Sequence, residues 1–175
     1  MIYKTHMAFA VTPALIIESA LDYINIYNEL LLYLAVAIGS LLPDLDENGS
    51  KLSQSFPIFP IVYELLGIRH RGVTHYLLFS FVFVTLSFFI LQINNADIYN
   101  NIIFYGLSYG YFMHLIGDML TKGGINNFYY PLINCKGVIL PKKFRFYTHS
   151  IEEFIFLYFL STLVVLQIIY RLVSL

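Results

Sequence analysis

The stretch YLLFSFVFVTLSFFILQI, residues 76–93, is a run of 18 residues without a charged side chain. A second run, FIFLYFLSTLVVLQIIY at residues 154–170, is also free of charge. A helix that crosses the hydrocarbon core of a bilayer needs about 20 mostly apolar residues, and both runs approach that length. The two stretches therefore predict membrane-spanning helices.

The overall composition also indicates a membrane protein. Hydrophobic residues make up 58% of the chain and charged residues only 12%, whereas soluble domains average roughly 45–50% and about 25%. The mean hydropathy is +0.70. The net charge of −1 gives no indication of nucleic-acid binding, and the single Cys135 cannot form an internal disulfide.

Three further apolar segments complete the predicted architecture. They are shorter, and they contain Pro13, Gly106 and Gly110, residue types that membrane helices tolerate better than soluble helices do. These segments are residues 7–17, 30–42 and 102–113. We expect an all-α fold, a polytopic membrane helical bundle of about five helices, in which residues 1–175 form one domain.

The first 20 residues allow a second interpretation, a cleaved signal peptide. Lys4 precedes an apolar run, and small residues follow at Ser19 and Ala20. The basic region is thin, however, and cleavage would remove His6. We therefore expect this segment to remain as the first helix.

Polar residues fall at alternate ends of the five predicted helices. If the helices alternate in direction, the starts of the first, third and fifth lie on the same side of the membrane as the ends of the second and fourth. All five histidines of the chain then lie at one membrane face, together with several carboxylates. The residues at this face are His6, Asp44, Asp46, His70, His75, His114, Asp118, His149, Glu152 and Glu153. The order of the segments thus predicts a polar site at one face.

The basic residues predict which face this is. Of the 10 Lys and Arg residues, only Arg171 falls at the opposite face. The others are Lys4, Lys51, Arg69, Arg71, Lys122, Lys136, Lys142, Lys143 and Arg145. Because Lys and Arg accumulate on the cytoplasmic side of membrane proteins, we expect the site on the cytoplasmic face of a bacterial inner membrane.

The spacing of the polar residues suits metal binding. His114 and Asp118, like His149 and Glu153, are separated by four positions, which on a helix places both side chains on one face. Imidazole and carboxylate together are the ligands of catalytic zinc, manganese and iron sites. One such pair is common by chance, but two pairs at a face with three more histidines indicate a metal site.

The number of candidate ligands favours more than one ion. A single catalytic zinc uses about three protein ligands and one open position. The predicted metal ligands exceed that number: His6, Asp44, Asp46, His75, His114, Asp118, His149 and Glu153, with His70 in reserve. We expect two or three divalent ions, zinc or manganese, which together can promote the displacement of a phosphoryl group.

Several residues have predicted roles in catalysis. Asp44 or Asp46 would act as a base where it is not fully engaged as a ligand, and Arg71 would neutralise a phosphate. Lys142, Lys143 and Arg145 would assist Arg71, and each of the four cations could instead contact anionic lipid. The predicted catalytic set is Asp44, Asp46, His70 and Arg71. The sequence contains no Gly-x-Ser-x-Gly, P-loop or Gly-x-Gly-x-x-Gly motif, which excludes the common serine-hydrolase, NTPase and dinucleotide-binding classes.

Four sequence motifs carry a resemblance to a known family. THMAF, GSLLPDLDE, HRGVTH and HLIGDMLTKGGI resemble the YdjM family, described as LexA-regulated, membrane-bound, metal-dependent hydrolases of bacteria. The resemblance runs from His6 to about Pro131, and it departs from the family pattern at Tyr76, where Ser is frequent. It implies metal-site positions at His6, Asp44, Asp46, His70, His75, His114 and Asp118. The His-x3-acid pairs are also similar to the ligand pattern of the zinc-dependent phospholipase C and S1/P1 nuclease fold, on which His149 and Glu153 depend.

Together these features predict a membrane-bound metal-dependent hydrolase. We expect a phosphoesterase that uses a metal-activated water on a phospholipid or another lipid-linked phosphate, with membrane lipids as partners and no nucleic acid. A divalent-metal transporter is an alternative, although transporters place ionisable groups near the middle of the membrane rather than at helix ends. A non-catalytic membrane protein with a structural metal site is the other alternative.

Overall fold

The computed structural model describes residues 1–21, 25–47, 49–55, 72–93 and 97–174, with the isolated positions 58, 61 and 65. Within these residues the chain is helical, and no strand is formed beyond two isolated β-bridges. The long helices are α1 (Tyr3–Leu21), α2 (Ile26–Gly39), α5 (Leu77–Gln92), α6 (Ile98–Met119) and α7 (Ile151–Ser174). The short elements are η1 (Leu42–Asp46), α3 (Lys51–Ser55), η2 (Val73–His75) and η3 (Lys142–Phe144). The predicted all-helical bundle of about five helices is confirmed.

Local signals set the ends of the helices. The side chain of Asn25 accepts a hydrogen bond from the Tyr27 amide and starts α2, and Asp97 does the same for α6 through the Asn100 amide. Such side-chain acceptors satisfy amides that have no partner inside the helix. α6 therefore begins earlier than the apolar segment suggests. α2 ends at Gly39, and Pro43 lies in the first turn of the following η1.

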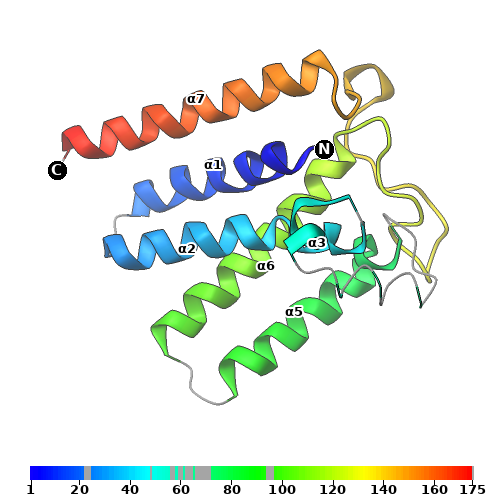
Figure 1. Ribbon diagram of the computed structural model, residues 1–175, viewed down its shortest axis with the longest axis horizontal. Helices are drawn as coiled ribbons and strands as arrows, with labels where there is room; N and C mark the ends of the chain where they lie inside the picture. The colour runs from blue at the N-terminus through cyan, green and yellow to red at the C-terminus, as the bar shows by residue number, and fades with distance from the viewer. Residues whose placement is uncertain are drawn as a thin grey trace.

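The long helices lie side by side and alternate in direction. α6 packs against α1, α2 and α5, and α7 packs against α1. Figure 1 shows the N-terminus, the loops and the first turn of α7 at one end of the bundle, and the C-terminus at the other. The end with the loops also contains η1 and η2. The alternation predicted from the sequence therefore brings the polar segments to one end of the molecule.

Small residues allow α2 and α6 to approach closely. Gly106 and Gly110 are one turn apart on α6, and they face Ala35, Val36 and Gly39 on α2. A Cβ atom at Gly110 would overlap the carbonyl oxygen of Val36. Glycines four residues apart commonly let membrane helices come into backbone contact. This close packing fixes the height of α6 relative to the end of α2.

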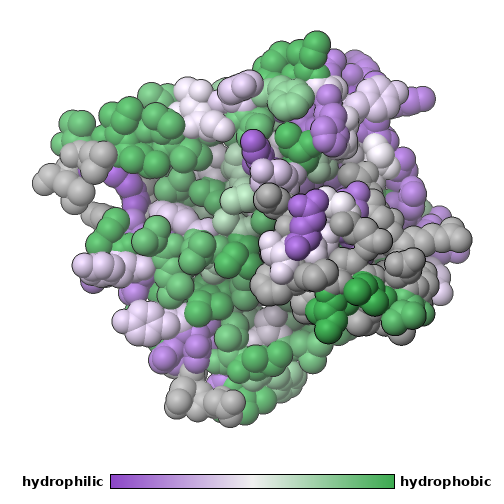
Figure 2. Space-filling model, in the orientation of Figure 1, coloured by the Kyte–Doolittle hydropathy of each residue, from purple (hydrophilic) through white to green (hydrophobic). Residues whose placement is uncertain are grey.

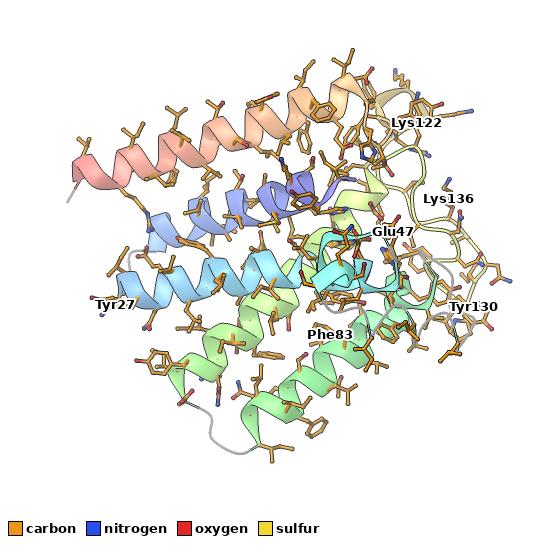
Figure 3. All side chains as sticks on the ribbon, viewed as in Figure 1. Tyr27, Glu47, Phe83, Lys122, Tyr130 and Lys136 are labelled. Atoms are coloured by element: carbon orange, nitrogen blue, oxygen red, sulfur yellow. The ribbon has the colours of Figure 1, made fainter. Side chains whose placement is uncertain are left out.

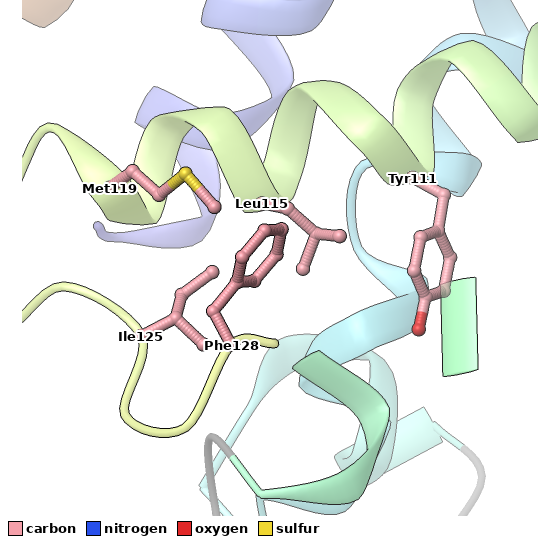
Figure 4. Close-up of a cluster of buried hydrophobic side chains, with 5 residues drawn as sticks. All are labelled: Tyr111, Leu115, Met119, Ile125 and Phe128. Atoms are coloured by element: carbon pink, nitrogen blue, oxygen red, sulfur yellow. The ribbon is translucent and has the colours of Figure 1, made fainter. Parts of the chain in front are cut away.

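Residues 120–150 form an ordered cap over the loop end of the bundle. Ile125 and Phe128 are buried against Leu115 and Met119 of α6, as Figure 4 shows. The Leu77 amide, at the start of α5, donates a hydrogen bond of 2.8 Å to the carbonyl oxygen of Phe128. The cap is thus fixed to both α5 and α6.

The outer surface of the bundle is apolar. Among the described residues, two segments are long and apolar enough to cross a membrane, Ile26–Asp46 and Ile151–Arg171, and α5 is a shorter apolar helix. Figure 2 shows hydrophobic side chains over the helical part of this face and hydrophilic ones concentrated toward the loop end. Apolar side chains that point outward on this scale are typical of contact with lipid.

Candidate metal centre

Five side chains from four elements meet at the loop end of the bundle. His6 lies in the first turns of α1, Asp44 in η1, His75 in η2, and His114 and Asp118 in the last turns of α6. We call these five residues the donor cluster. The three histidines and Asp118 are at most 1% exposed, whereas the Asp44 side chain is 13% exposed. Asp44 is therefore the member of the cluster nearest to water.

His114 lies at the centre of the donor cluster, and its orientation is fixed. Its Nδ1 lies 2.7 Å from the carbonyl oxygen of Ser40, and because a carbonyl only accepts, Nδ1 carries the proton and donates it. In the neutral ring the lone pair is then on Nε2. Nε2 lies 3.2 Å from His75 Nε2 and 3.4 Å from Asp44 Oδ1.

The orientation of His75 follows from its neighbour Thr74. The Thr74 hydroxyl donates to Asp46 Oδ2 at 2.6 Å, because a carboxylate only accepts. The same hydroxyl lies 2.9 Å from His75 Nδ1 and has no second proton, so Nδ1 donates to it. The lone pair of His75 is therefore also on Nε2, which lies 3.7 Å from Asp44 Oδ1. Tyr111 donates to the carbonyl oxygen of Thr74 and supports this arrangement.

Three electron-rich atoms therefore face one another in a buried space. They are Nε2 of His75, Nε2 of His114 and Oδ1 of Asp44, and in the neutral tautomers no proton lies between them. Such an arrangement is unfavourable by itself and becomes favourable when a cation lies among the three atoms. Metal-bound histidines commonly donate their other ring nitrogen to a carbonyl or a polar side chain, as both rings do here. Asp44, His75 and His114 offer ligand atoms that all lie within 4.8 Å of one another.

His6, His114 and Asp118 form a second group of the same kind. The His6 ring stacks on the His114 ring with centroids 3.7 Å apart, and its Nε2 lies 3.3 Å from Asp118 Oδ1. Neither ring nitrogen of His6 has a hydrogen-bond partner within the described chain, although the ring is buried. Gly117 permits this approach, because a Cβ there would lie 3.2 Å from His6 Nδ1. The amino group of Met1 donates to Asp118 Oδ1 at 2.6 Å. The two groups share His114.

Asp46 lies beside the donor cluster, on the Nδ1 side of His75. Its side chain is buried and accepts the hydrogen bond from Thr74, and its Oδ2 lies 3.8 Å from His75 Nδ1 rather than from Nε2. Asp46 is thus placed to orient His75. The sequence alone does not distinguish the role of Asp46 from that of Asp44. Both residues lie in η1, and only the directions of their side chains give them different partners.

Glu153 and His149 do not join the donor cluster. Both carboxylate oxygens of Glu153 accept backbone hydrogen bonds of 2.7 Å, one from the Ile2 amide and one from the His149 amide. The ring of His149 is exposed. The predicted His149–Glu153 ligand pair assumed helical spacing, but α7 begins at Ile151, and His149 has a φ of 64° outside the helix. The sequence S150-x-x-E153 is instead a capping-box pattern, which identifies Glu153 as a helix-capping residue.

His70 and Arg71 lie outside the described residues. Ser40, Thr74 and Tyr111 were not singled out in the sequence, yet they orient the two central imidazoles. Tyr111 precedes His114 by three positions and so shares its helix face, which is a usable signal. Ser40 acts through its backbone, for which the sequence carries no signal.

These features define a class: an integral membrane protein built as a helical bundle, with a buried histidine–aspartate cluster at one end. The family model described as YdjM inner membrane protein matches residues 1–174. The chain belongs to this family, and the resemblance seen in the motifs is confirmed. It is also 32% identical over 123 residues to a Bacillus subtilis (strain 168) protein titled "Uncharacterized protein YvsG", a match that covers 70% of this chain and 69% of the relative. No solved structure shows a significant match.

Proposed function

We propose that this protein is a membrane-bound metal-dependent hydrolase, a phosphoesterase whose substrate is a phospholipid or another lipid-linked phosphate. The observation that carries the proposal is the convergence of the lone pairs of His75 and His114 on Asp44 in a buried space. The partners of the two rings leave both lone pairs facing inward, as a metal requires. The proposal extends the family's membrane location to a chemical activity.

The residues present fit a small number of divalent ions. Nε2 of His114 has one lone pair and would bind one ion, so Asp44 and Asp118 would supply donors to any second ion. His6 then supplies an additional nitrogen, and its ring nitrogens have no competing hydrogen bond. Nitrogen and carboxylate donors of this kind suit zinc and also manganese.

Residues of the chain would have separate roles in the proposed reaction. A bound divalent ion would supply Lewis acidity to a phosphoryl oxygen and lower the pKa of water. Asp44, the most exposed donor, would accept a proton from an incoming water where its carboxylate is not fully engaged as a metal ligand. Thr74 and Asp46 hold His75 in one orientation. The donor cluster lies at the loop end of the bundle, where the helices end. A lipid substrate with its acyl chains in the membrane would therefore have its phosphate near the level of the donor cluster.

The proposal is tested by metal content and turnover of the purified protein. We expect the wild-type protein in detergent to contain zinc or manganese, measured by elemental analysis, and to hydrolyse at least one substrate in a panel of phospholipids, lipid-linked phosphates and generic phosphodiesters. His114→Ala should remove both the metal and the activity. The matched control is His149→Ala, whose exposed ring is outside the donor cluster; this variant should retain both.

A structural metal site is the second candidate, and the burial of the donor cluster favours it. Four of its five members are at most 1% exposed, which leaves little room for a substrate. In this case, the wild-type protein would contain metal and lose thermal stability with a chelator, yet show no turnover across the panel. That result would overturn the hydrolase proposal.

A further inference from the structure

The cap has an unusual charge distribution. Residues 120–150 contain five of the 10 Lys and Arg residues of the chain and none of its 11 Asp and Glu residues. The five are Lys122, Lys136, Lys142, Lys143 and Arg145. A segment of this kind attracts anions wherever it is accessible. Lys136, Lys142 and Lys143 are exposed, so their charges are available at the surface.

The same segment also exposes large apolar side chains. Leu132 is 84% exposed and Ile133 63%, and Phe144 and Tyr147 are exposed to a similar degree. These side chains are exposed although the cap is folded. Ile125 and Phe128 are buried against α6 and anchor the cap there. Two of the cations lie over exposed aromatic rings: Lys122 Nζ is 4.0 Å from the Tyr147 ring centroid, and Lys143 Nζ is 4.8 Å from that of Phe144. The cap thus presents charge and apolar area together.

Both edges of the cap lie beside the first turns of membrane helices. At one edge, the Tyr130 ring packs on Tyr76 with centroids 5.4 Å apart, directly before the exposed apolar residues of α5 begin. At the other edge, Phe146 packs on Phe156 of α7, with centroids 5.8 Å apart. Figure 3 shows Lys122, Tyr130 and Lys136 spread across this end of the bundle, far from Tyr27. Tyrosines at such positions are typical of the headgroup region of a bilayer.

We propose that the cap is an interfacial surface that binds the anionic headgroups of the leaflet in which this end of the bundle lies. The exposed cations of the cap would bind phosphate groups, and the exposed apolar residues would enter the boundary between headgroups and acyl chains. A soluble acidic partner would account for the charges but not for the exposed apolar side chains of Leu132 and Ile133. The inference is independent of whether the donor cluster is catalytic.

A native cysteine in the cap allows a fluorescent probe to be attached there. Cys135 is the single cysteine of the sequence, and it is exposed between Ile133 and Lys136. An environment-sensitive fluorophore on Cys135 of the full-length protein would be compared in nanodiscs of phosphatidylcholine alone and of phosphatidylcholine with phosphatidylglycerol. With the anionic lipid we expect a blue-shifted emission, quenching by a headgroup-attached nitroxide lipid, and protection from iodide in the water.

Variants separate the electrostatic contribution from folding. Lys142→Gln with Lys143→Gln should lower the preference of the label for the anionic bilayer by about fivefold per lysine at low salt. The matched control, Lys142→Arg with Lys143→Arg, should keep this preference, and equal melting temperatures would show that both proteins fold. Leu132→Ser with Ile133→Ser should reduce the blue shift while the preference for phosphatidylglycerol persists. An emission equal in both bilayers and in detergent, with full quenching by iodide, would overturn the proposal and show that the cap extends into water.

Discussion

At the scale of the residue, the orientation of two imidazoles depends on groups outside the donor cluster. The Ser40 carbonyl fixes His114, and the Asp46–Thr74 pair fixes His75. Hydrogen-bond partners of this kind fix the tautomer and the orientation of each imidazole, so each ring is preorganised for metal binding. The Thr74 hydroxyl is the point at which this arrangement is most easily tested, because it contacts Asp46 and His75 at once.

Thr74→Val is expected to lower metal affinity by about 10–100-fold, the range typical for the loss of a partner that orients a ligand. Valine keeps the shape of threonine but offers no hydroxyl, so Asp46 loses a donor and His75 Nδ1 loses an acceptor. Thr74→Ser, which retains the hydroxyl, should restore most of the affinity. Affinity would be measured by competition with a chromogenic chelator. Equal affinities in the valine and serine variants would show that the hydroxyl does not orient His75.

At the scale of the element, the contact between α2 and α6 determines where the site forms. Ser40 directly follows α2 and His114 lies in α6, so their hydrogen bond requires the close approach that Gly106 and Gly110 allow. Gly110→Ala places a Cβ against the backbone of Val36 and Ser40. We expect a loss of stability of about 1–3 kcal/mol, seen as a lower melting temperature in detergent, together with weaker metal binding.

The control for this prediction is Gly49→Ala. A Cβ at Gly49 would meet no atom within 4 Å, so this variant should melt and bind metal like the wild type. If Gly110→Ala also behaved like the wild type, the two helices would not be in backbone contact.

The start of α7 provides a second prediction for an element. Glu153 accepts hydrogen bonds from two backbone amides, and one of them, that of Ile2, precedes α1 and therefore His6. Glu153→Gln removes the charge and leaves one acceptor oxygen, so we expect a stability loss of about 2 kcal/mol. Glu152→Gln is the matched control, because Glu152 is exposed, and it should melt like the wild type. Melting curves of the two variants in detergent would be compared, and a reversed order would contradict this role of Glu153.

The elements also show how far the sequence predicts this structure. The hydropathy of the sequence predicted the long helices, because each needs a long apolar segment. The alternating direction of these helices then predicted that His6, His75 and His114 lie at the same end. The cap has no such periodicity, so the insertion of Ile125 and Phe128 under α6 was not predictable. His149 was predicted to pair with Glu153 on one helix face, but α7 begins two residues after His149, at Ile151. A spacing of four positions predicts a shared face only inside a helix.

At the scale of the whole molecule, α7 is attached to the rest of the bundle at both ends. Its first turn is joined to the start of α1 through Glu153, and Arg171 near its end forms an ion pair with Glu29 of α2. Between these points it packs mainly on α1, and much of its surface is apolar and exposed. The helix is therefore positioned by polar contacts near its two ends, and the exposed apolar surface between them is typical of a helix that faces lipid.

The uneven distribution of basic residues predicts the orientation of the molecule in the membrane. The cap end has most of the Lys and Arg residues and the opposite end has Arg171, so we expect the donor cluster and the cap at the cytoplasmic face of the membrane. Native Cys135 reports the cap end. Tyr27, 78% exposed at the start of α2, reports the other end when it is replaced as Tyr27→Cys in a Cys135→Ser background. A membrane-impermeant maleimide should label Tyr27→Cys in intact spheroplasts and Cys135 only after permeabilisation. Labelling of Cys135 in intact spheroplasts, with protection of Tyr27→Cys, would place the site on the outer face.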